Sequence, residues 1–295
     1  MNPILYVTHT INWLLMILMP ILLGIYLKRR FNLGWRLWWI GAATFILSQV
    51  GHIPFNIAVG ALIETGVLPA PPPAWELPVQ AIFLGLSAGL WEELARYATY
   101  RWWAKTARSW SEGLMLGAGH GGIEAILLGL LVLATFAGML VARNLDLSQM
   151  VPPEQLLLAQ QQIQAYWSVP WYDTLLGALE RASTLVFHLA ASLLVLQVFV
   201  RRQIRWLWLA VAWHALLDTL AVFASQTWGI YVTEAILAAF ALINLGIIFL
   251  LRPQEPELRL PSNPPEERGL TSEIEPERLP EVEESPENLE KTRYN

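Results

Sequence analysis

Long, uninterrupted apolar runs restrict the fold of this chain more than any other feature of its sequence. A run of about 20 apolar residues is long enough to cross the hydrocarbon core of a membrane as an α-helix. The 295 residues, 55% of them hydrophobic and only 15% charged, contain seven such runs. The sequence therefore predicts an all-α, polytopic integral membrane protein of about seven transmembrane helices, with approximate ranges 4–27, 37–63, 78–100, 112–142, 172–200, 206–225 and 229–251.

The charges between these runs alternate, and this alternation predicts an orientation. Lys and Arg concentrate in residues 28–36, 101–108 and 201–205, whereas the few charged residues of 64–77 and 143–171 are mostly acidic. Cytoplasmic loops of membrane proteins are enriched in Lys and Arg, so the three basic segments should be cytoplasmic. The N-terminus is then outside the cell membrane and the C-terminus is in the cytoplasm.

The chain changes character at its C-terminal end. Residues 1–252 form the predicted transmembrane helical domain, whereas residues 253–295 are rich in Pro and Glu. A segment this polar cannot bury a core, and we expect a disordered, acidic cytoplasmic tail. Between the fourth and fifth spans, residues 143–171 should form an external segment with a short amphipathic helix. The chain has no cysteine, which excludes disulfides and Cys-ligated metals. The sequence also has no patch of basic residues that would indicate a nucleic acid as a partner.

Three charged residues lie close together inside the third predicted span. They are Glu92, Glu93 and Arg96, in the segment Gly-Leu-Trp-Glu-Glu-Leu-Ala-Arg. A charge in hydrocarbon costs about 3 kcal/mol on insertion scales, so such residues usually have a function. A structural ion cluster that ties helices together is the alternative interpretation.

Other spans offer partners for this cluster. Glu124 follows His120 and Asp218 follows His214 by four residues each, so each pair shares a helix face, and His188 lies in a further span. Counting about 1.5 Å per residue from the basic segments places all of these groups in one layer, from the inner half of the membrane to its middle.

Carboxylates and imidazoles that converge in a dry layer are suited to activating water, and two mechanisms remain open. In one, an ionised glutamate acts as a general base and imidazoles hydrogen-bond a developing oxyanion. In the other, His120, His188 and His214 bind a zinc ion, and Glu92 or Glu93 is the base. Glu124 or Asp218 would then be a fourth metal ligand, or would hydrogen-bond one of the ligands.

The motifs around these residues resemble the YhfC family of bacterial membrane proteins, which is predicted to consist of intramembrane metalloproteases. The resemblance covers about residues 1–250 and rests on four segments in order: Glu-Glu-Leu-Ala-Arg at 92–96, Gly-His-Gly-Gly-Ile-Glu-Ala at 119–125, Phe-His at 187–188 and His-Ala-Leu-Leu-Asp at 214–218. The family is distantly related to CAAX-processing, bacteriocin-immunity and PrsW proteases. The resemblance implies a membrane protease in a bacterial cell membrane.

Roles for individual residues follow from those relatives. The resemblance implies that Glu92 is the base, that Glu93 and Arg96 orient it, and that His188 and His214 are oxyanion or ligand groups. Asp218 would replace an Asn of the CAAX-type relatives. Those relatives also separate the Glu pair from its Arg by three residues rather than two, and they lack a counterpart of the pair His120 and Glu124.

We therefore predict an intramembrane protease that hydrolyses a peptide bond in a membrane-embedded or lipid-anchored substrate, with one zinc ion in the metal-dependent mechanism. A transporter or proton carrier would also use intramembrane Glu, His and Arg, and a non-catalytic scaffold or immunity protein is a third possibility. The sequence indicates no oligomeric state.

Several polar residues in the spans have simpler interpretations. We interpret Gln49, His52 and Asn56 as interhelical or interfacial contacts. Arg181 is interpreted as structural and as a partner of Glu234 in the last span.

Overall fold

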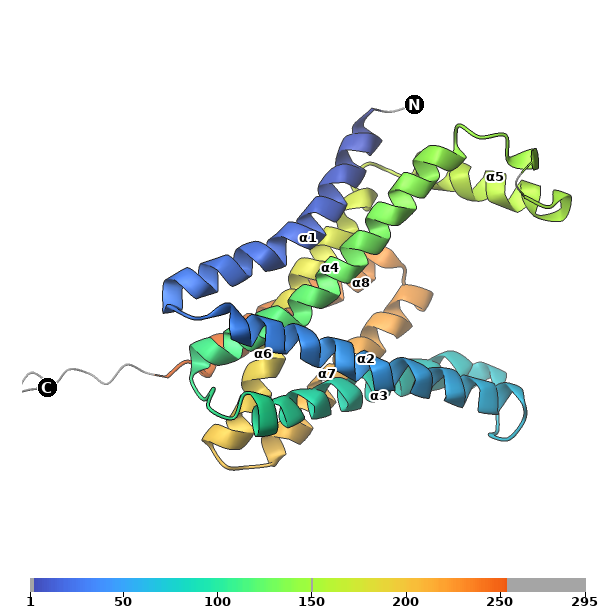
Figure 1. Cartoon of the computed structure of the whole chain (residues 1–295). Helices are drawn as coiled ribbons and strands as arrows, with labels where there is room; N and C mark the ends of the chain where they lie inside the picture. Colours follow the sequence, from blue (N-terminus) through green and yellow to red (C-terminus); the bar gives the residue numbers. More distant parts are fainter. Residues whose placement is uncertain (1–2, 150, 254–295) are drawn as a thin grey trace, which may run out of the picture. The chain divides into compact units, whose positions relative to one another are not determined.

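The structure is a computed structural model that describes residues 3–149 and 151–253. In these residues all regular structure is helical, as the apolar runs predict, and short turns connect the helices (Figure 1). The predicted acidic tail lies outside the described residues, apart from Pro253. The eight α-helices of the described chain are α1 (Ile4–Phe31), α2 (Trp35–Glu64), α3 (Glu76–Ala98), α4 (Trp110–Ala142), α5 (Pro153–Ser168), α6 (Leu176–Val200), α7 (Arg205–Thr227) and α8 (Ile230–Leu250).

Six of these helices are long and apolar enough to cross a membrane, so the protein is a multi-pass membrane protein. They are α1, α2, α4, α6 with the turn before it, α7 and α8. The helix α3 matches the position of the remaining predicted span and has 23 residues. It is not among the six because its two adjacent glutamates and its arginine reduce its apolar character. The 16-residue helix α5 is the short helix expected between the fourth and fifth spans.

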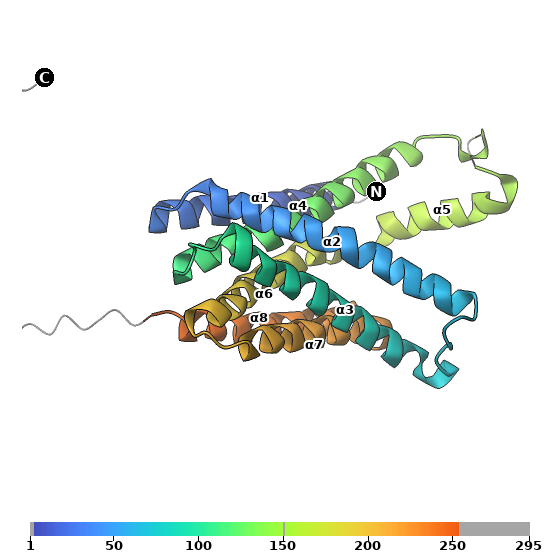
Figure 2. The same ribbon diagram turned by 60° about the horizontal axis from the view of Figure 1, so that its bottom comes forward.

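Two helices form the centre of the bundle. The helix α4 packs against α1, α2 and α6, and α6 also contacts α8 and α7, whereas α3 packs mainly along α7. The largest apolar core lies around the start of α4 and the second half of α6, where Leu116, Leu193 and Val195 are almost completely buried. Figure 2 shows the turns that join α1 to α2, α3 to α4 and α6 to α7 at one end of the bundle.

We call this end, formed by residues 28–36, 99–109 and 201–205, the basic end. The turn between α2 and α3 and the segment that contains α5 lie at the other end, which we call the acidic end (Figure 2). The grouping of the basic segments agrees with the alternation of charge along the sequence.

The start of α4 and its crossing with α2 are fixed by short-range chemistry. The Ser109 side chain accepts a hydrogen bond from the backbone N–H of Glu112, whose carboxylate accepts from the Ser109 backbone in return. This capping box sets the first turn of α4. Three turns later, a Cβ at Gly119 would lie 1.9 Å from the carbonyl oxygen of Trp38 on α2, so only glycine allows this close crossing. The crossing holds the next residue, His120, in the interior of the bundle.

Candidate active site

Glu92, Glu93 and Arg96 lie in the last turns of α3 and face the interior of the bundle. Their exposed fractions are 7%, 0% and 0%. The guanidinium of Arg96 forms an ion pair with Glu93, and its Nη2 lies 3.7 Å from Oε2 of Glu92. Buried charges need such partners, because removing one partner leaves the other charge uncompensated.

Glu92 is the point at which four helices meet. Its Oε2 lies 3.1 Å from Nε2 of His120 on α4 and 4.0 Å from Nε2 of His214 on α7. Its Oε1 accepts a hydrogen bond of 3.1 Å from Nε2 of Gln49 on α2. One carboxylate on α3 therefore contacts polar groups from α2, α4 and α7.

Glu93 positions the ring of His214. Nδ1 of His214 donates a 2.7 Å hydrogen bond to Oε1 of Glu93. This bond fixes the ring so that Nε2 points toward Glu92 and lies 3.5 Å from Oδ2 of Asp218. Asp218 is at the edge of the cluster, with 37% of its side chain exposed.

His188 connects the α3 charges to Glu124 on α4. Nη2 of Arg96 donates to Nδ1 of His188 at 2.6 Å, and Nε2 of His188 lies 2.6 Å from Oε2 of Glu124. A guanidinium can only donate, so Nδ1 accepts and the Nε2–H group donates to the carboxylate. Gly121 makes room for this ring, since a Cβ there would lie 2.6 Å from Cδ2 of His188.

The partner predicted for Arg181 is wrong. Nη1 of Arg181 donates to Oε1 of Glu124 at 2.5 Å, and Nη2 contacts Glu180. In the described part of the chain no salt bridge joins Arg181 to Glu234. The helix α6 turns Arg181 toward α4, where Glu124 offers a carboxylate that also faces His188.

The eight residues singled out from the sequence thus form one continuous polar network. The structure brings together residues from α3, α4, α6 and α7, with Asp218 at the edge: Glu92, Glu93, Arg96, His120, Glu124, His188, His214 and Asp218.

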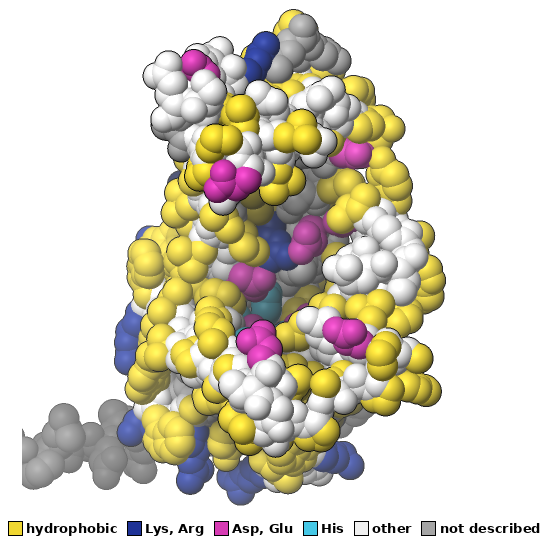
Figure 3. Space-filling view, turned by 90° about the vertical axis from the view of Figure 1, so that its right-hand side faces the viewer, with side chains coloured by type: hydrophobic (Ala, Val, Ile, Leu, Met, Phe, Trp, Pro, Cys, Tyr) yellow, Lys and Arg dark blue, Asp and Glu magenta, His cyan; other side chains and the backbone are white. Residues whose placement is uncertain are grey.

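A cavity of about 770 Å³ gives access to this network. Its polar lining includes Glu92, Glu124 and Asp218, and its remaining walls are mostly apolar side chains of α2 and α4. Figure 3 shows one face of the molecule hollowed, with acidic, basic and histidine side chains visible inside an otherwise largely apolar surface. The other members of the network are not among the lining residues: Glu93, Arg96, His120, His188 and His214 lie behind the three carboxylates.

The sequence interpretation missed the polar residues that α2 contributes to this cavity. Gln49 and His52 line the cavity, and Nδ1 of His52 lies 3.3 Å from Oε1 of Gln49. Nδ2 of Asn56 lies 2.9 Å from Nε2 of His52, which also faces Oγ of Ser87 on α3 at 3.0 Å. The interhelical contacts expected of Gln49 and His52 are confirmed, whereas Asn56 contacts His52 on its own helix. Their spacing on one face of an apolar helix was the available signal for a role at the site.

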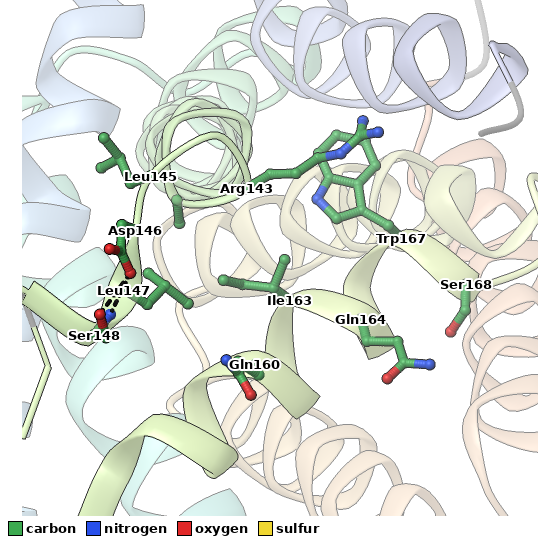
Figure 4. Close-up of a pocket in the computed structure, with 11 residues that line it drawn as sticks. Arg143, Leu145, Asp146, Leu147, Ser148, Gln160, Ile163, Gln164, Trp167 and Ser168 are labelled. Atoms are coloured by element: carbon green, nitrogen blue, oxygen red, sulfur yellow. Dashed lines mark hydrogen bonds between the residues drawn. The ribbon is translucent and has the colours of Figure 1, made fainter. Parts of the chain in front are cut away.

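A second cavity, of about 500 Å³, lies between the end of α4 and α5 (Figure 4). There the guanidinium of Arg143 lies over the ring of Trp167, and Asp146 contacts Ser148. This cavity is lined by no histidine or glutamate from the described residues, so it lacks the groups that the network provides.

The donor atoms of the network fit a divalent metal ion. Glu92, His120 and His188 each offer one ligand atom, and these atoms lie within 4.8 Å of one another. Two imidazoles and one carboxylate are an established ligand set for catalytic zinc. Within the described chain, Nδ1 of His120 and Oε2 of Glu93 are buried without a hydrogen-bond partner, which buried polar groups rarely are. His188 would have to exchange one of its two present contacts for the metal.

Comparisons with known proteins agree with this geometry. A family model described as YhfC intramembrane metalloprotease matches residues 15–241, a range that includes the whole network. The chain is also 33% identical over 220 residues to a protein of Bacillus subtilis (strain 168) described as the uncharacterized membrane protein YhfC, which covers 70% of this chain and 79% of the relative. No solved structure matches the chain. The chain belongs to the YhfC family of intramembrane metalloproteases.

Proposed function

We propose that this protein hydrolyses a peptide bond within or next to the bilayer, in a membrane-embedded or lipid-anchored substrate. The observation that carries the proposal is the position of Glu92. Its carboxylate lines a cavity and faces imidazoles from two other helices. Beneath it, Glu93 and Arg96 are paired and closed off from the cavity. The description of the family supports the same reaction.

The proposal includes an orientation in a bacterial cell membrane. We place α3 across the membrane as a seventh span, the basic end in the cytoplasm and the N-terminus outside. The charges of the basic end support this orientation. Glu92 lies six residues before the end of α3, which is about 9 Å along the helix. The reaction would then take place in the inner half of the membrane.

Glu92, His120 and His188 would hold the metal ion, which we propose to be zinc. When bound, zinc supplies Lewis acidity, which makes water a better nucleophile and polarises a carbonyl group. Glu124 lines the same cavity and is held by His188 and Arg181. Its carboxylate is therefore placed to accept the proton of the attacking water.

His214 would stabilise negative charge on the oxygen of the attacked carbonyl. Its Nδ1–H group is fixed by Glu93, and its Nε2 points toward Glu92. A protonated ring can donate a hydrogen bond from Nε2, and such preorganised donors stabilise the oxyanion that forms in peptide hydrolysis.

A metal-free variant of this mechanism is the second candidate, and one observation favours it. Both ring nitrogens of His188 already have partners, Arg96 and Glu124. In this variant Glu92 would be the general base, and the imidazoles of His120 and His214 would stabilise the oxyanion.

Metal content tests the proposal without a known substrate. The full chain, purified in detergent without a polyhistidine tag, should contain about one zinc ion per molecule by mass spectrometry. The variants Glu92→Gln, His120→Ala and His188→Ala should lose it. The control His9→Ala should keep it, because His9 stacks on Tyr166 and makes no contact with the network.

An intact chain that contains no zinc, and binds none when zinc is added, would exclude the metal-dependent mechanism. The glutamate-dependent variant would then predict hydrolysis that is lost in Glu92→Gln and insensitive to chelators.

A further inference from the structure

A separate, mostly apolar cavity lies at the basic end of the bundle. Its volume is about 330 Å³, and residues near the ends of α6, α7 and α8 form its walls. Leu194 lines it from α6, Ile247 lines it from α8, and Trp206 and Trp213 line it from α7. Arg201 is the one charged residue among its described lining residues, and none of them belongs to the catalytic network. We call this space the basic-end cavity.

The back of the basic-end cavity is fixed by the packing of the three helices. Leu194 is only 3% exposed. Nε1 of Trp213 donates a hydrogen bond of 2.9 Å to Oδ1 of Asn244 on α8, and Asn244 is completely buried. The indole ring therefore has a fixed position, and the apolar back wall belongs to the fold itself.

The front of the same cavity is open toward the surroundings of the bundle. Leu209 and Leu250 also line it, and they are 49% and 83% exposed. The helices α6, α7 and α8 are each long and apolar enough to cross a membrane. Exposed apolar side chains on such helices face lipid, so an acyl chain can occupy the cavity without leaving hydrocarbon.

Arg201 is an oriented cation with unused hydrogen-bond donors. It follows the last residue of α6, and its Nε donates a hydrogen bond of 3.0 Å to Oε1 of Gln197, which is buried. Its guanidinium also lies over the ring of Trp206, 4.8 Å from the ring centroid. In the described part of the chain, its Nη1 and Nη2 groups donate to no protein acceptor and no carboxylate forms a salt bridge with it. Those N–H groups match the oxygens of a phosphate.

The charges around the basic-end cavity have one sign. Residues 194–213 and 247–252, which supply its walls, contain Arg201, Arg202, Arg205 and Arg252, and no Asp or Glu. Basic pockets between transmembrane helices bind the anionic head groups of lipids. The combination of an apolar space and an unpaired guanidinium therefore selects a ligand that is apolar at one end and anionic at the other.

We propose that the basic-end cavity binds one phospholipid of net negative charge, with an acyl chain against the apolar walls and the phosphate on Arg201. The acidic residues of 254–295 are another source of negative charge, but that segment is rich in Pro and Glu and offers no continuous apolar stretch for the walls. The bound lipid would join the ends of α6 and α7, the helices that carry His188 and His214. This inference is independent of the proposed proteolytic function.

Native mass spectrometry of the full-length protein tests this inference, because it resolves the binding of single lipids. The probe is phosphatidylglycerol, added to the delipidated protein in detergent, and the comparison lipid is phosphatidylcholine with the same acyl chains. The first phosphatidylglycerol should bind about 10-fold more tightly than phosphatidylcholine, the effect of one charged hydrogen bond. Glycerol phosphate, the head group without acyl chains, should not displace it at equal concentration.

Variants of Arg201 identify the site. Arg201→Gln should weaken the binding of the first phosphatidylglycerol by about 10-fold, whereas Arg201→Lys, which keeps the charge, should weaken it less. The matched control is Arg36→Gln, an exposed arginine of the basic end that does not line the cavity, and it should leave the affinity unchanged. Phosphatidylglycerol should also raise the unfolding temperature of the intact chain more than that of Arg201→Gln. Unfolding temperatures without lipid show that the variants are folded.

Equal affinities for the two lipids, or equal losses in Arg201→Gln and Arg36→Gln, would overturn the inference and indicate a diffuse attraction to the whole basic end. Displacement by glycerol phosphate would overturn the role of the apolar walls and leave a phosphate site. If the intact chain bound no phosphatidylglycerol, the inference would be wrong, and residues 254–295 would become the candidate occupant.

Discussion

Arg96 on α3 and Arg181 on α6 are two buried arginines inside long helices, but they lie in differently packed parts of the bundle. Arg96 is close to the basic end, is completely buried and contacts Glu93 and His188. Arg181 is near the start of α6, toward the acidic end, and contacts Glu124 and Glu180. The side chains of Glu124 and Glu180 are 20% and 38% exposed.

The comparison separates two uses of the same residue type. Around Arg96 the helices are closely packed, and neither Arg96 nor its partner Glu93 lines the cavity, so this ion pair supports the site from below. Around Arg181 the helices leave a cavity, and its partner Glu124 lines that cavity. A buried ion pair therefore indicates a site only when one of its members also faces an accessible space.

The largest expected effect on stability is that of Arg96→Ala. The substitution leaves Glu93 buried without its cation, which costs about 3–5 kcal/mol. Arg181→Ala should cost less, about 1–3 kcal/mol, because the carboxylates of its partners are partly exposed. Thermal unfolding in detergent measures both changes. Equal losses would contradict the distinction between a closed and an open region.

The two partners of Arg181 should differ in function. Glu124→Gln removes the proposed proton acceptor and should lower the rate of peptide hydrolysis about 10²- to 10⁴-fold, with zinc content retained. The matched control Glu180→Gln removes a charge from the other side of the same arginine and should leave the rate nearly unchanged. Similar rates for both variants would show that Glu124 is only a structural partner of Arg181.

We expect the carboxylate of Glu93 to affect the rate of hydrolysis by orienting the ring of His214. Glu93→Gln weakens the bond that orients the ring, and such changes in outer contacts typically cost about 10- to 100-fold in activity. We expect kcat to fall while zinc content stays the same. Glu234→Gln is the control, because Glu234 is also a buried glutamate but contacts no residue of the network. A parallel loss of activity in both variants would argue against a positioning role.

The smallest expected effect is that of Gly138→Ala, which is compared with Gly119→Ala on the same helix α4. A Cβ at Gly119 would overlap the backbone of Trp38, so Gly119→Ala should destabilise the protein by about 1–3 kcal/mol. Gly138 has no atom near its Cβ position, and Gly138→Ala should be neutral or stabilising by up to about 1 kcal/mol, because alanine favours helix. Unfolding temperatures of the two variants, measured together, test whether the crossing of α2 and α4 is as close as described.

Much of this arrangement could be predicted from the sequence, because the membrane restricts what an apolar chain can do. Runs of about 20 apolar residues must become helices, since hydrocarbon offers no other partner for the backbone. The same constraint makes charged residues inside a span conspicuous, so Glu92, His120 and His188 could be selected without a structure. Their alignment in one layer followed from counting residues along each helix.

The direction in which each side chain points, and the residue with which it pairs, could not be predicted by counting residues. Distance along a helix gives the depth of a side chain but not which neighbouring helix it meets. By residue counting, Arg181 could lie level with either Glu124 or Glu234. The packing of α6 against α4 brings it into contact with Glu124. Likewise, Gln49 and His52 have the composition of ordinary interhelical contacts, and only the cavity beside α2 gives them access to a substrate.

The sequence by itself determined the helices and the polar residues within them, because hydrophobic length and charge are properties of local segments. The tertiary structure alone decided that Glu92 faces the cavity while Glu93, its neighbour in the chain, is closed off against Arg96 and His214. Successive residues of a helix point about 100° apart, and the environment on each side is set by the other helices that pack there.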